Sequence, residues 1–233
     1  MRLQHPHIVK CFDYGELDET HGQWTGVLYL AMELLDAQDL MCFVEGEWAQ
    51  PVERVLDLLE QASDALDYCH AQGVLHRDIK LQNIMLDRVR RHVTLMDFGL
   101  ARAKDSTFVT KAGKISGTPS YMAPELLLGG THHEGSDIFA LGVVGYWMAT
   151  GQRPFHGPGG LPDLFVAILQ QEPPPIRRLV DDVPAPLEDL ILRLLNKQPI
   201  DIRQPSADPL GKSGVPSTQP RVWCASRGCD RVT

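Results

Sequence analysis

The stretch from 76 to 83 reads His76-Arg77-Asp78-Ile79-Lys80-Leu81-Gln82-Asn83 and places three polar groups of different chemistry close together. Asp78 carries a carboxylate that can accept a proton, and Lys80 carries an ammonium cation. Asn83 carries an amide oxygen that can bind a metal ion. Each residue alone is ordinary in a polar loop, so the meaning of the stretch depends on the motifs that follow it.

Two further motifs follow in a fixed order, Asp97-Phe98-Gly99 and then Ala123-Pro124-Glu125. Together the three motifs resemble the signature set of the eukaryotic-type Ser/Thr protein kinases, and the resemblance covers roughly residues 1–206. It implies an α+β, protein-kinase-like fold. In that fold a mainly α-helical large lobe carries the motifs, and a β small lobe, incomplete in this chain, precedes it.

The resemblance also divides the chain into three parts. Residues 1–35 match a remnant of the small lobe that ends in the hinge, and residues 36–209 match the large lobe. The last part, 210–233, is rich in Gly, Ser, Pro and Gln and has almost no apolar periodicity. That composition predicts a disordered tail.

The activity that the resemblance implies is transfer of the γ-phosphate of ATP to Ser or Thr hydroxyls of a protein substrate, with Mg²⁺. Asp78 is then the catalytic base, and Lys80 is the cation near the moving phosphate. Asn83 and Asp97 are the metal ligands. In the family the Thr at the position of Thr118 bonds both the catalytic Asp and the Lys after it. The presence of Thr118 together with Lys80 favours Ser/Thr over Tyr acceptors.

The nucleotide site that the resemblance implies draws on the segment that begins at Met32. Met32 is the residue behind the nucleotide, and backbone groups of Glu33 and Leu35 hydrogen-bond the adenine edge. Asp39 matches the acidic residue that meets the ribose hydroxyls, and Met85 matches the floor of the adenine pocket. Without the family, Met32 is equally well explained as a core residue.

Several other residues match structural or regulatory positions of the family. Asp137 matches the Asp that holds the catalytic-loop backbone, and Arg77 is a fixed cation on which a phosphorylated loop residue could dock. Thr110 and Ser116 are the candidate phosphorylation sites, although a loop rich in Ser and Thr can also be simply flexible. The full set of these positions is His76, Arg77, Phe98, Gly99, Thr110, Ser116, Glu125, Asp137 and Arg203. The last of them, Arg203, is expected to pair with Glu125.

Hydrophobic periodicity predicts the main elements. Apolar residues recur at three- and four-residue steps after Pro51, which predicts a helix that ends near Gly73. The segment 137–148 is apolar on all sides and predicts a buried helix, and two shorter helices are expected over 161–168 and 187–195. The run 27–32 predicts a buried strand, and two short strands over 84–86 and 93–96 predict a hairpin.

Composition excludes several classes of protein. With 22 Lys+Arg against 30 Asp+Glu, the formal net charge is −8, which argues against a nucleic-acid partner. The basic run from Arg88 to Arg91 is interpreted as a solvated turn. Five cysteines form no paired metal or disulfide framework, no apolar run is long enough to span a bilayer, and no signal peptide is visible. A soluble, cytoplasmic chain is expected.

The chain contains neither a Gly-rich phosphate loop nor a Lys–Glu pair at the family's usual upstream position. The main clamp for the α- and β-phosphates is therefore missing. We expect a kinase fragment with impaired activity by itself. The alternative is a catalytically inactive half-kinase that acts as a protein-binding scaffold, and retention of Asp78, Lys80, Asn83 and Asp97 favours the enzyme.

Overall fold

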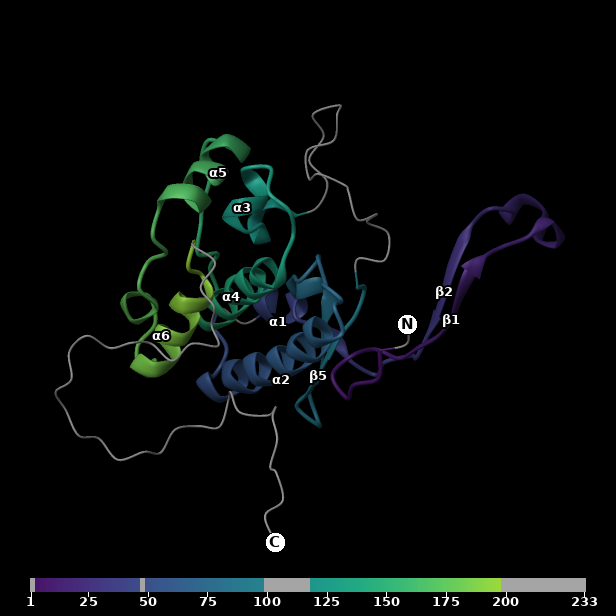
Figure 1. Ribbon diagram of the computed structural model, residues 1–233. Coiled ribbons are helices and arrows are strands. Elements are labelled where there is room, and N and C mark those ends of the chain that lie inside the picture. Colours follow the sequence, from purple (N-terminus) through teal and green to yellow (C-terminus); the bar gives the residue numbers. More distant parts are fainter. Residues whose placement is uncertain (1–2, 47–48, 99–117, 198–233) are drawn as a thin grey trace, which may run out of the picture. The chain divides into compact units, whose positions relative to one another are not determined.

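One apolar helix, α4 (Glu134–Thr150), forms the centre of the core (Figure 1). Every residue from 139 to 150 is buried, and Asp137 near the start of the helix is buried as well. A helix without a polar face is stable in water only when neighbours cover it on all sides. The prediction of a buried helix over 137–148 is confirmed, with Ile138 only half-buried.

The computed structural model describes residues 3–46, 49–98 and 118–197. Gly99, Thr110, Ser116 and Arg203, which the sequence marks as candidate positions, lie outside these ranges. Besides α4, the elements are β1 (Cys11–Glu16), β2 (Leu28–Met32), β3 (Gln38–Asp39), α1 (Met41–Gly46), α2 (Val52–Ala71), β4 (Ile84–Asp87), β5 (His92–Leu95), α3 (Pro124–Leu127), α5 (Leu161–Gln170) and α6 (Ala185–Leu194), with short 3-10 turns at Glu19–Trp24, Leu81–Asn83, Pro119–Tyr121 and Ile176–Arg178.

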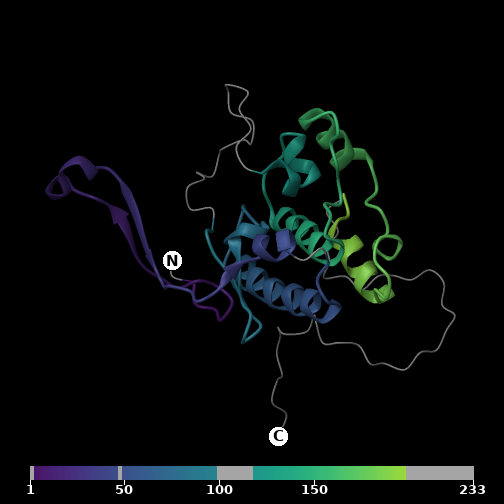
Figure 2. The same ribbon diagram turned by 180° about the vertical axis from the view of Figure 1, so that it is seen from behind.

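Helices α2 and α6 pack against α4, as Figure 1 and Figure 2 show. Two glycines of α4 allow the close approach. A Cβ at Gly142 would lie 2.8 Å from the Cβ of Leu194 on α6, and a Cβ at Gly145 would lie 3.0 Å from Leu59 on α2. Both values are at or below the lower limit of ordinary contact, so side chains at these positions would push the helices apart.

Helix α2 leads into residues 76–83, which are called the catalytic loop here after the family position that they match. Its buried residues recur on one face, which produces the amphipathic pattern seen in the sequence. The helix ends in a Schellman motif, in which Gly73 N–H donates to His70 C=O at 2.9 Å and Val74 N–H donates to Cys69 C=O at 2.9 Å. Gly73 has a φ of +71°, which a residue without a Cβ adopts without strain. The predicted helix and its glycine stop are confirmed.

A small antiparallel sheet in the order β3-β4-β5 lies beside α2. The β4–β5 hairpin has Asn83 directly before its first strand, and Asp97 follows shortly after its second strand. Met96 N–H donates to Asn83 C=O at 3.0 Å and closes this end of the hairpin. The predicted hairpin is confirmed, and it brings two candidate metal ligands to one place.

Strands β1 and β2 form a separate two-stranded antiparallel sheet. The strand predicted over 27–32 is therefore present, but the prediction that it is buried is wrong. Leu28 is 79% exposed and Tyr14 is 71% exposed. Within the described residues β2 pairs with β1 alone and has no second layer against it, so β-forming side chains produce a strand without producing burial.

Candidate active site

The catalytic loop begins directly after the Schellman motif of α2 and is fixed to α4 by the Asp137 carboxylate. Oδ2 accepts the His76 N–H at 2.8 Å, and Oδ1 accepts the Arg77 N–H at 2.8 Å. Arg77 has a φ of +66°, an unfavourable value for a residue with a long side chain. The two hydrogen bonds offset that strain, and they are the contact that the sequence predicts for Asp137.

Two histidines complete the surroundings of Asp137. His70 Nε2 on α2 lies 2.9 Å from Oδ2, and His132 Nε2 lies 2.9 Å from Oδ1. Burial alone would raise the pKa of this carboxyl, but the hydrogen bonds from His132 and His70 outweigh burial and hold the pKa well below its usual range. Asp137 is therefore a buried anion with four donors, and it joins α2, α4 and the catalytic loop.

The three polar groups of the opening stretch meet at Asp78. Lys80 Nζ lies 2.7 Å from Asp78 Oδ2, and Asn83 Nδ2 donates to the same oxygen at 2.9 Å. Asn83 Nδ2 also donates to the Asp78 carbonyl at 2.8 Å. The Asp78 side chain is 29% exposed and that of Lys80 is 22% exposed, so solvent and a substrate can reach both. The carboxylate is thus oriented by two donors yet accessible.

Asp97 and Asn83 are a suitable pair of ligands for Mg²⁺. Asp97 is exposed and has a φ of +57°, and the Met96–Asn83 backbone bond sets the residue before it beside Asn83. In its contacts with Asp78, Asn83 uses its amide nitrogen, so the amide oxygen is not engaged there. Mg²⁺ usually takes one or two protein oxygens together with waters and phosphates, and this donor set fits that habit.

A metal site of another kind is absent from the part of the chain that the structure describes. In that part no three His, Cys, Asp or Glu side chains come together as a metal-binding group. A closed structural zinc site needs four such ligands.

His76 and Phe98 connect the catalytic loop with the Asp97 segment. Their ring centroids lie 4.4 Å apart and their planes are tilted by 38°. His76 is fully buried, and burial lowers the pKa of its imidazole below the usual value. Because Phe98 is also buried, this contact fixes Asp97 from behind while its carboxylate stays in solvent.

The candidate nucleotide residues fall into two groups. Met32 pairs with Cys11 at the end of β2, and Glu33 is bonded to Lys10 through its N–H at 2.9 Å and its Oε1 at 2.8 Å. Asp39 and Met85 are direct partners in the β3–β4 pair. The structure therefore brings Asp39 and Met85 together.

Leu35 and Asp39 differ in what surrounds them. Leu35 is half-buried just beyond β2. Asp39 has a contact that the sequence did not indicate, because its Oδ1 accepts the Cys42 N–H at 3.2 Å. Its carboxylate thus stands at the start of α1, where it acts as a helix cap.

Thr118 does not make the predicted hydrogen bonds to Asp78 and Lys80 in this structure. It is exposed, and it lines a small hollow together with Arg77 and Asp78. Lys80 and Asn83 already donate to Asp78 Oδ2, so the carboxylate is held without the hydroxyl. Thr118 is near the predicted site but is not bonded to it.

Glu125 has partners other than Arg203 within the described residues. Ser136 Oγ donates to Glu125 Oε1 at 2.5 Å, and His133 Nε2 lies 3.3 Å from the same oxygen. Both partners belong to the start of α4, where His133 and Ser136 also form a capping box. The predicted pairing of Glu125 with Arg203 lies outside the described residues.

Sequence reasoning missed the histidines around Asp137. His70 is 67 residues away from Asp137 and His132 is five residues away. The only available signals were a His in the last turn of a predicted helix and two adjacent His residues before a buried Asp. Neither signal points to Asp137 without the fold.

An accessible carboxylate held beside an ammonium group is an arrangement that phosphoryl-transferring sites use. Comparison with known proteins narrows the class. The family model described as "Protein kinase domain" matches residues 1–205. The chain therefore belongs to the protein kinase domain family.

Curated relatives agree with this assignment. The serine/threonine-protein kinase pkn3 of Myxococcus xanthus is 37% identical over 208 residues, which are 86% of this chain and 37% of that protein. PknA of Mycobacterium tuberculosis is 38% identical over 197 residues, which are 84% of this chain and 44% of that protein. PrkC of Bacillus subtilis is 32% identical over 197 residues, covering 84% of this chain and 29% of that protein.

The chain thus spans between 29% and 44% of the length of these three relatives. Among the helices that the structure describes, none combines the length and the apolar character needed to cross a membrane.

Proposed function

We propose that these residues form the catalytic part of a Ser/Thr protein kinase that transfers the γ-phosphate of ATP to hydroxyl groups of a protein substrate. The observation that carries the proposal is the arrangement around Asp78, an accessible carboxylate oriented by Lys80 at 2.7 Å and by Asn83 at 2.9 Å. This pair sets a proton acceptor beside a cation, and a transfer between a hydroxyl and a phosphate uses both groups. The proposed place of action is the cytoplasm.

In the proposed mechanism Asp78 accepts the hydrogen bond of the substrate hydroxyl and takes its proton. The new bond from the hydroxyl oxygen to the γ-phosphorus forms as the bond between that phosphorus and the ADP oxygen breaks, and ADP leaves. Lys80 lies beside Asp78 and stabilises the negative charge of the moving phosphoryl group. Asp97 and Asn83 would hold Mg²⁺, which neutralises charge on the phosphates when it is bound. Asp137 acts only through the backbone, because its hydrogen bonds fix the loop that carries Asp78.

ATP is proposed to bind between the segment after β2 and the β3–β4 pair. The carbonyl of Glu33 and the N–H of Leu35 are the proposed partners of the adenine edge, and Met32 and Met85 the apolar contacts. Support for this comes from the pairing of Met85 with Asp39, which places an apolar side chain beside a carboxylate. Asp39 would meet the ribose through the oxygen that does not cap α1.

Ser and Thr, rather than Tyr, are the proposed acceptors. This proposal is supported by Lys80 and by the relatives pkn3 and PknA, which are named serine/threonine-protein kinases. Thr118, which lines the hollow beside Asp78, is proposed to contact the substrate segment. Thr110 and Ser116 remain proposed phosphorylation sites, and the proposed partner of a phosphate on either is Arg77.

The test compares Asp78→Asn with Asp97→Asn in a Mg²⁺-dependent assay with labelled ATP and peptides that carry one Ser, Thr or Tyr. It uses the 233-residue chain and its longest in-frame extension upstream of Met1. Asp78→Asn should lower kcat by roughly 10²–10⁴-fold with nearly unchanged ATP binding, because Asp78 faces the acceptor. Asp97→Asn should weaken Mg²⁺–ATP binding as well.

The length of the chain provides a second comparison. The 233 residues contain no Gly-rich phosphate loop, so we expect weak nucleotide binding and slow transfer by this chain alone. Rapid autophosphorylation that Asp78→Asn abolishes would show that the clamp is not required. Transfer that survives Asp78→Asn in the extended protein would overturn the assignment of the base.

A further inference from the structure

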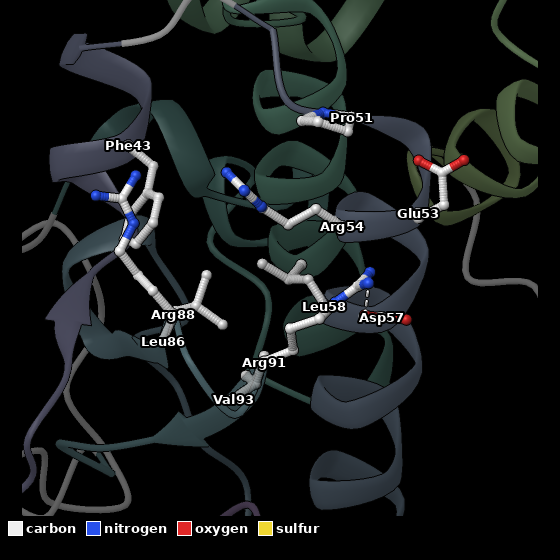
Figure 3. A pocket seen from close by; sticks show the side chains of 10 residues that line it. All are labelled: Phe43, Pro51, Glu53, Arg54, Asp57, Leu58, Leu86, Arg88, Arg91 and Val93. Atoms are coloured by element: carbon white, nitrogen blue, oxygen red, sulfur yellow. Dashed lines mark ion pairs between the residues drawn. The ribbon is translucent and has the colours of Figure 1, made fainter.

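One recess lies between α1, the start of α2 and the turn of the β4–β5 hairpin (Figure 3). Arg88 and Arg91 of that turn, which the sequence suggested to be solvated, line the recess, and Arg91 Nη2 lies 2.6 Å from Asp57 Oδ2. The described residues that line this recess include none of the catalytic loop. The recess therefore provides no contact with the groups around Asp78.

Another hollow lies next to Asp78 itself. Its walls include Arg77, Thr118 and His132. The sequence predicted a role in the site for Arg77, Asp78 and Thr118 but none for His132. The contacts of His132 therefore show what it adds to the site.

His132 reaches the catalytic loop through the Asp137 carboxylate. Its Nε2 lies 2.9 Å from Asp137 Oδ1, and the same oxygen accepts the Arg77 N–H at 2.8 Å. Burial alone would raise the pKa of Asp137, but hydrogen bonds, with that of His132 first among them, hold it below its usual range. The carboxylate is therefore ionised and accepts, so the hydrogen of this bond lies on His132 Nε2.

The backbone that this carboxylate holds is strained. Arg77 has a φ of +66°, and a residue other than glycine keeps such a value only where its surroundings impose it. The terminal torsion of an Asp side chain is broad, so the carboxylate of Asp137 needs donors that fix its plane. His132 at Oδ1 and His70 at Oδ2 supply them. Loss of the His132 donor would let the carboxylate turn and weaken its hold on the Arg77 N–H.

The two histidines differ in what they connect. His70 belongs to α2, its side chain is 5% exposed, and it does not line the hollow beside Asp78. His132 lies in the segment between α3 and α4, and its side chain is 13% exposed. The next residue, His133, lies 3.3 Å from Glu125 of the Ala-Pro-Glu motif. His132 thus joins the catalytic loop to the segment that follows this motif.

We propose that His132 is a positioning residue for phosphoryl transfer, which fixes the Asp137 carboxylate that holds Arg77 and thereby sets the place of Asp78. The inference rests on the proposed function. His132 acts through Asp137, so its loss should affect the rate of transfer and not the binding of ATP. A base that is displaced by about 1 Å can lose on the order of 10²-fold in rate.

The first test measures kcat and the KM for ATP, in whichever of the two protein forms named above transfers phosphate faster. His132→Leu removes the donor and should lower kcat by about 10–100-fold with the KM for ATP within about twofold. His132→Gln should keep kcat within about threefold of the natural value, because a Gln side-chain N–H can donate from the place of the imidazole Nε2.

His133→Asn is the matched control, because it removes the neighbouring imidazole and leaves His132 in place. His133 is the N-cap of α4, and Asn is among the best residues at that position. The control variant should keep kcat within about twofold of the natural value.

The second test needs no activity and follows amide hydrogen exchange of the 233-residue chain by NMR. In His132→Leu the exchange rate of the Arg77 N–H, divided by that of the Val144 N–H in α4, should rise at least about tenfold. The ratio removes any general loss of stability, because Val144 is buried in the central helix and exchanges with global unfolding. His132→Gln should leave the ratio near its natural value.

Three results would overturn the proposal: an unchanged kcat in His132→Leu, an equal loss of kcat in His132→Gln, and an equal rise of the two exchange rates. If His132→Leu does not fold, His132→Met repeats both tests with a flexible side chain that fills the space without a donor. Absence of transfer by the natural protein would overturn the proposed function instead. The Arg77 exchange ratio would then still decide whether His132 holds the catalytic loop.

Discussion

Two apolar segments of this chain differ in their exposure to solvent. The run 139–149 in α4 is entirely buried, whereas in β2 every residue from 28 to 31 is exposed. Both are rich in large apolar side chains. Helix α4 has α2 and α6 packed against it, and β2 has only β1 among the described residues.

The difference shows that an apolar sequence favours burial, but the segment is buried only when other elements pack against it. A strand pair without a second layer buries little surface and is at best marginally stable. Exposed large side chains such as Leu28 and Trp24 gather on such a pair and favour association. The stability of the described part should therefore be concentrated around α4.

Hydrogen exchange should show the largest difference between the two regions. Amides of α4 should exchange only with global unfolding, at about 5–15 kcal/mol, and amides of β1 and β2 with local opening of roughly 0–2 kcal/mol. The measurement is exchange of the 233-residue chain followed by mass spectrometry of peptides. Equal protection in both regions would mean that another element covers the hairpin.

Removal of the Asp137 carboxylate should be the most damaging single change around α4. Asp137→Ala leaves two histidines and two backbone N–H groups without their acceptor, and the loss of buried partners of this kind costs on the order of 3–5 kcal/mol. The free energy of unfolding in urea measures it. Glu60→Ala, an exposed acid on α2, is the control and should stay within about 0.5 kcal/mol.

Glycine substitutions compare packing in the two regions directly. Gly142→Ala places a Cβ 2.8 Å from Leu194 in the core and should destabilise the chain by about 1–3 kcal/mol. Gly15→Ala in β1 would place a Cβ 3.0 Å from the Tyr29 ring, which is 38% exposed and can turn away. Its effect should be below about 0.5 kcal/mol. A larger loss from Gly15→Ala than from Gly142→Ala would contradict the proposed location of the core.

Elements with strong local signals could be predicted from the sequence. Helix α2 has a periodic apolar face and a glycine stop, and the β4–β5 hairpin has two short apolar runs around a polar turn, so both were foreseen. The exposure of β2 could be predicted only from the incomplete small lobe that the family resemblance implies, because a β-forming run by itself does not say what packs against the strand.

The contacts of the candidate site also divide into those that local sequence predicts and those that depend on the fold. Motif spacing brought Asp78, Lys80 and Asn83 together, because all three lie on one short loop. The histidines that hold Asp137 come from α2 and from the segment before α4, and only the fold brings them together. The Thr118 contact did not form, since a motif gives the neighbourhood of a side chain but not its hydrogen bonds.

The smallest expected effect is on the pH dependence of the free energy of unfolding, to which the buried His76 contributes. Burial holds the pKa of His76 below its unfolded value of 6.5. Between the two pKa values the unfolded chain binds a proton that the folded chain does not, so the stabilisation is complete above pH 6.5 and decreases as the pH falls. For one proton the slope is at most about 1.4 kcal/mol per pH unit.

His76→Phe isolates the contribution of His76 to the pH dependence of stability, because phenylalanine keeps a flat ring against Phe98 and cannot be protonated. Urea unfolding at pH 7.5, 6.5 and 5.5 should show a shallower loss of stability on acidification in this variant than in the natural chain. His7, whose pKa burial also lowers, contributes equally to both and cancels in the difference. The lowered pKa of Asp137 affects stability only below about pH 3.8, outside the measured range. If His76→Phe has the same slope as the natural chain, His76 is not a buried neutral group.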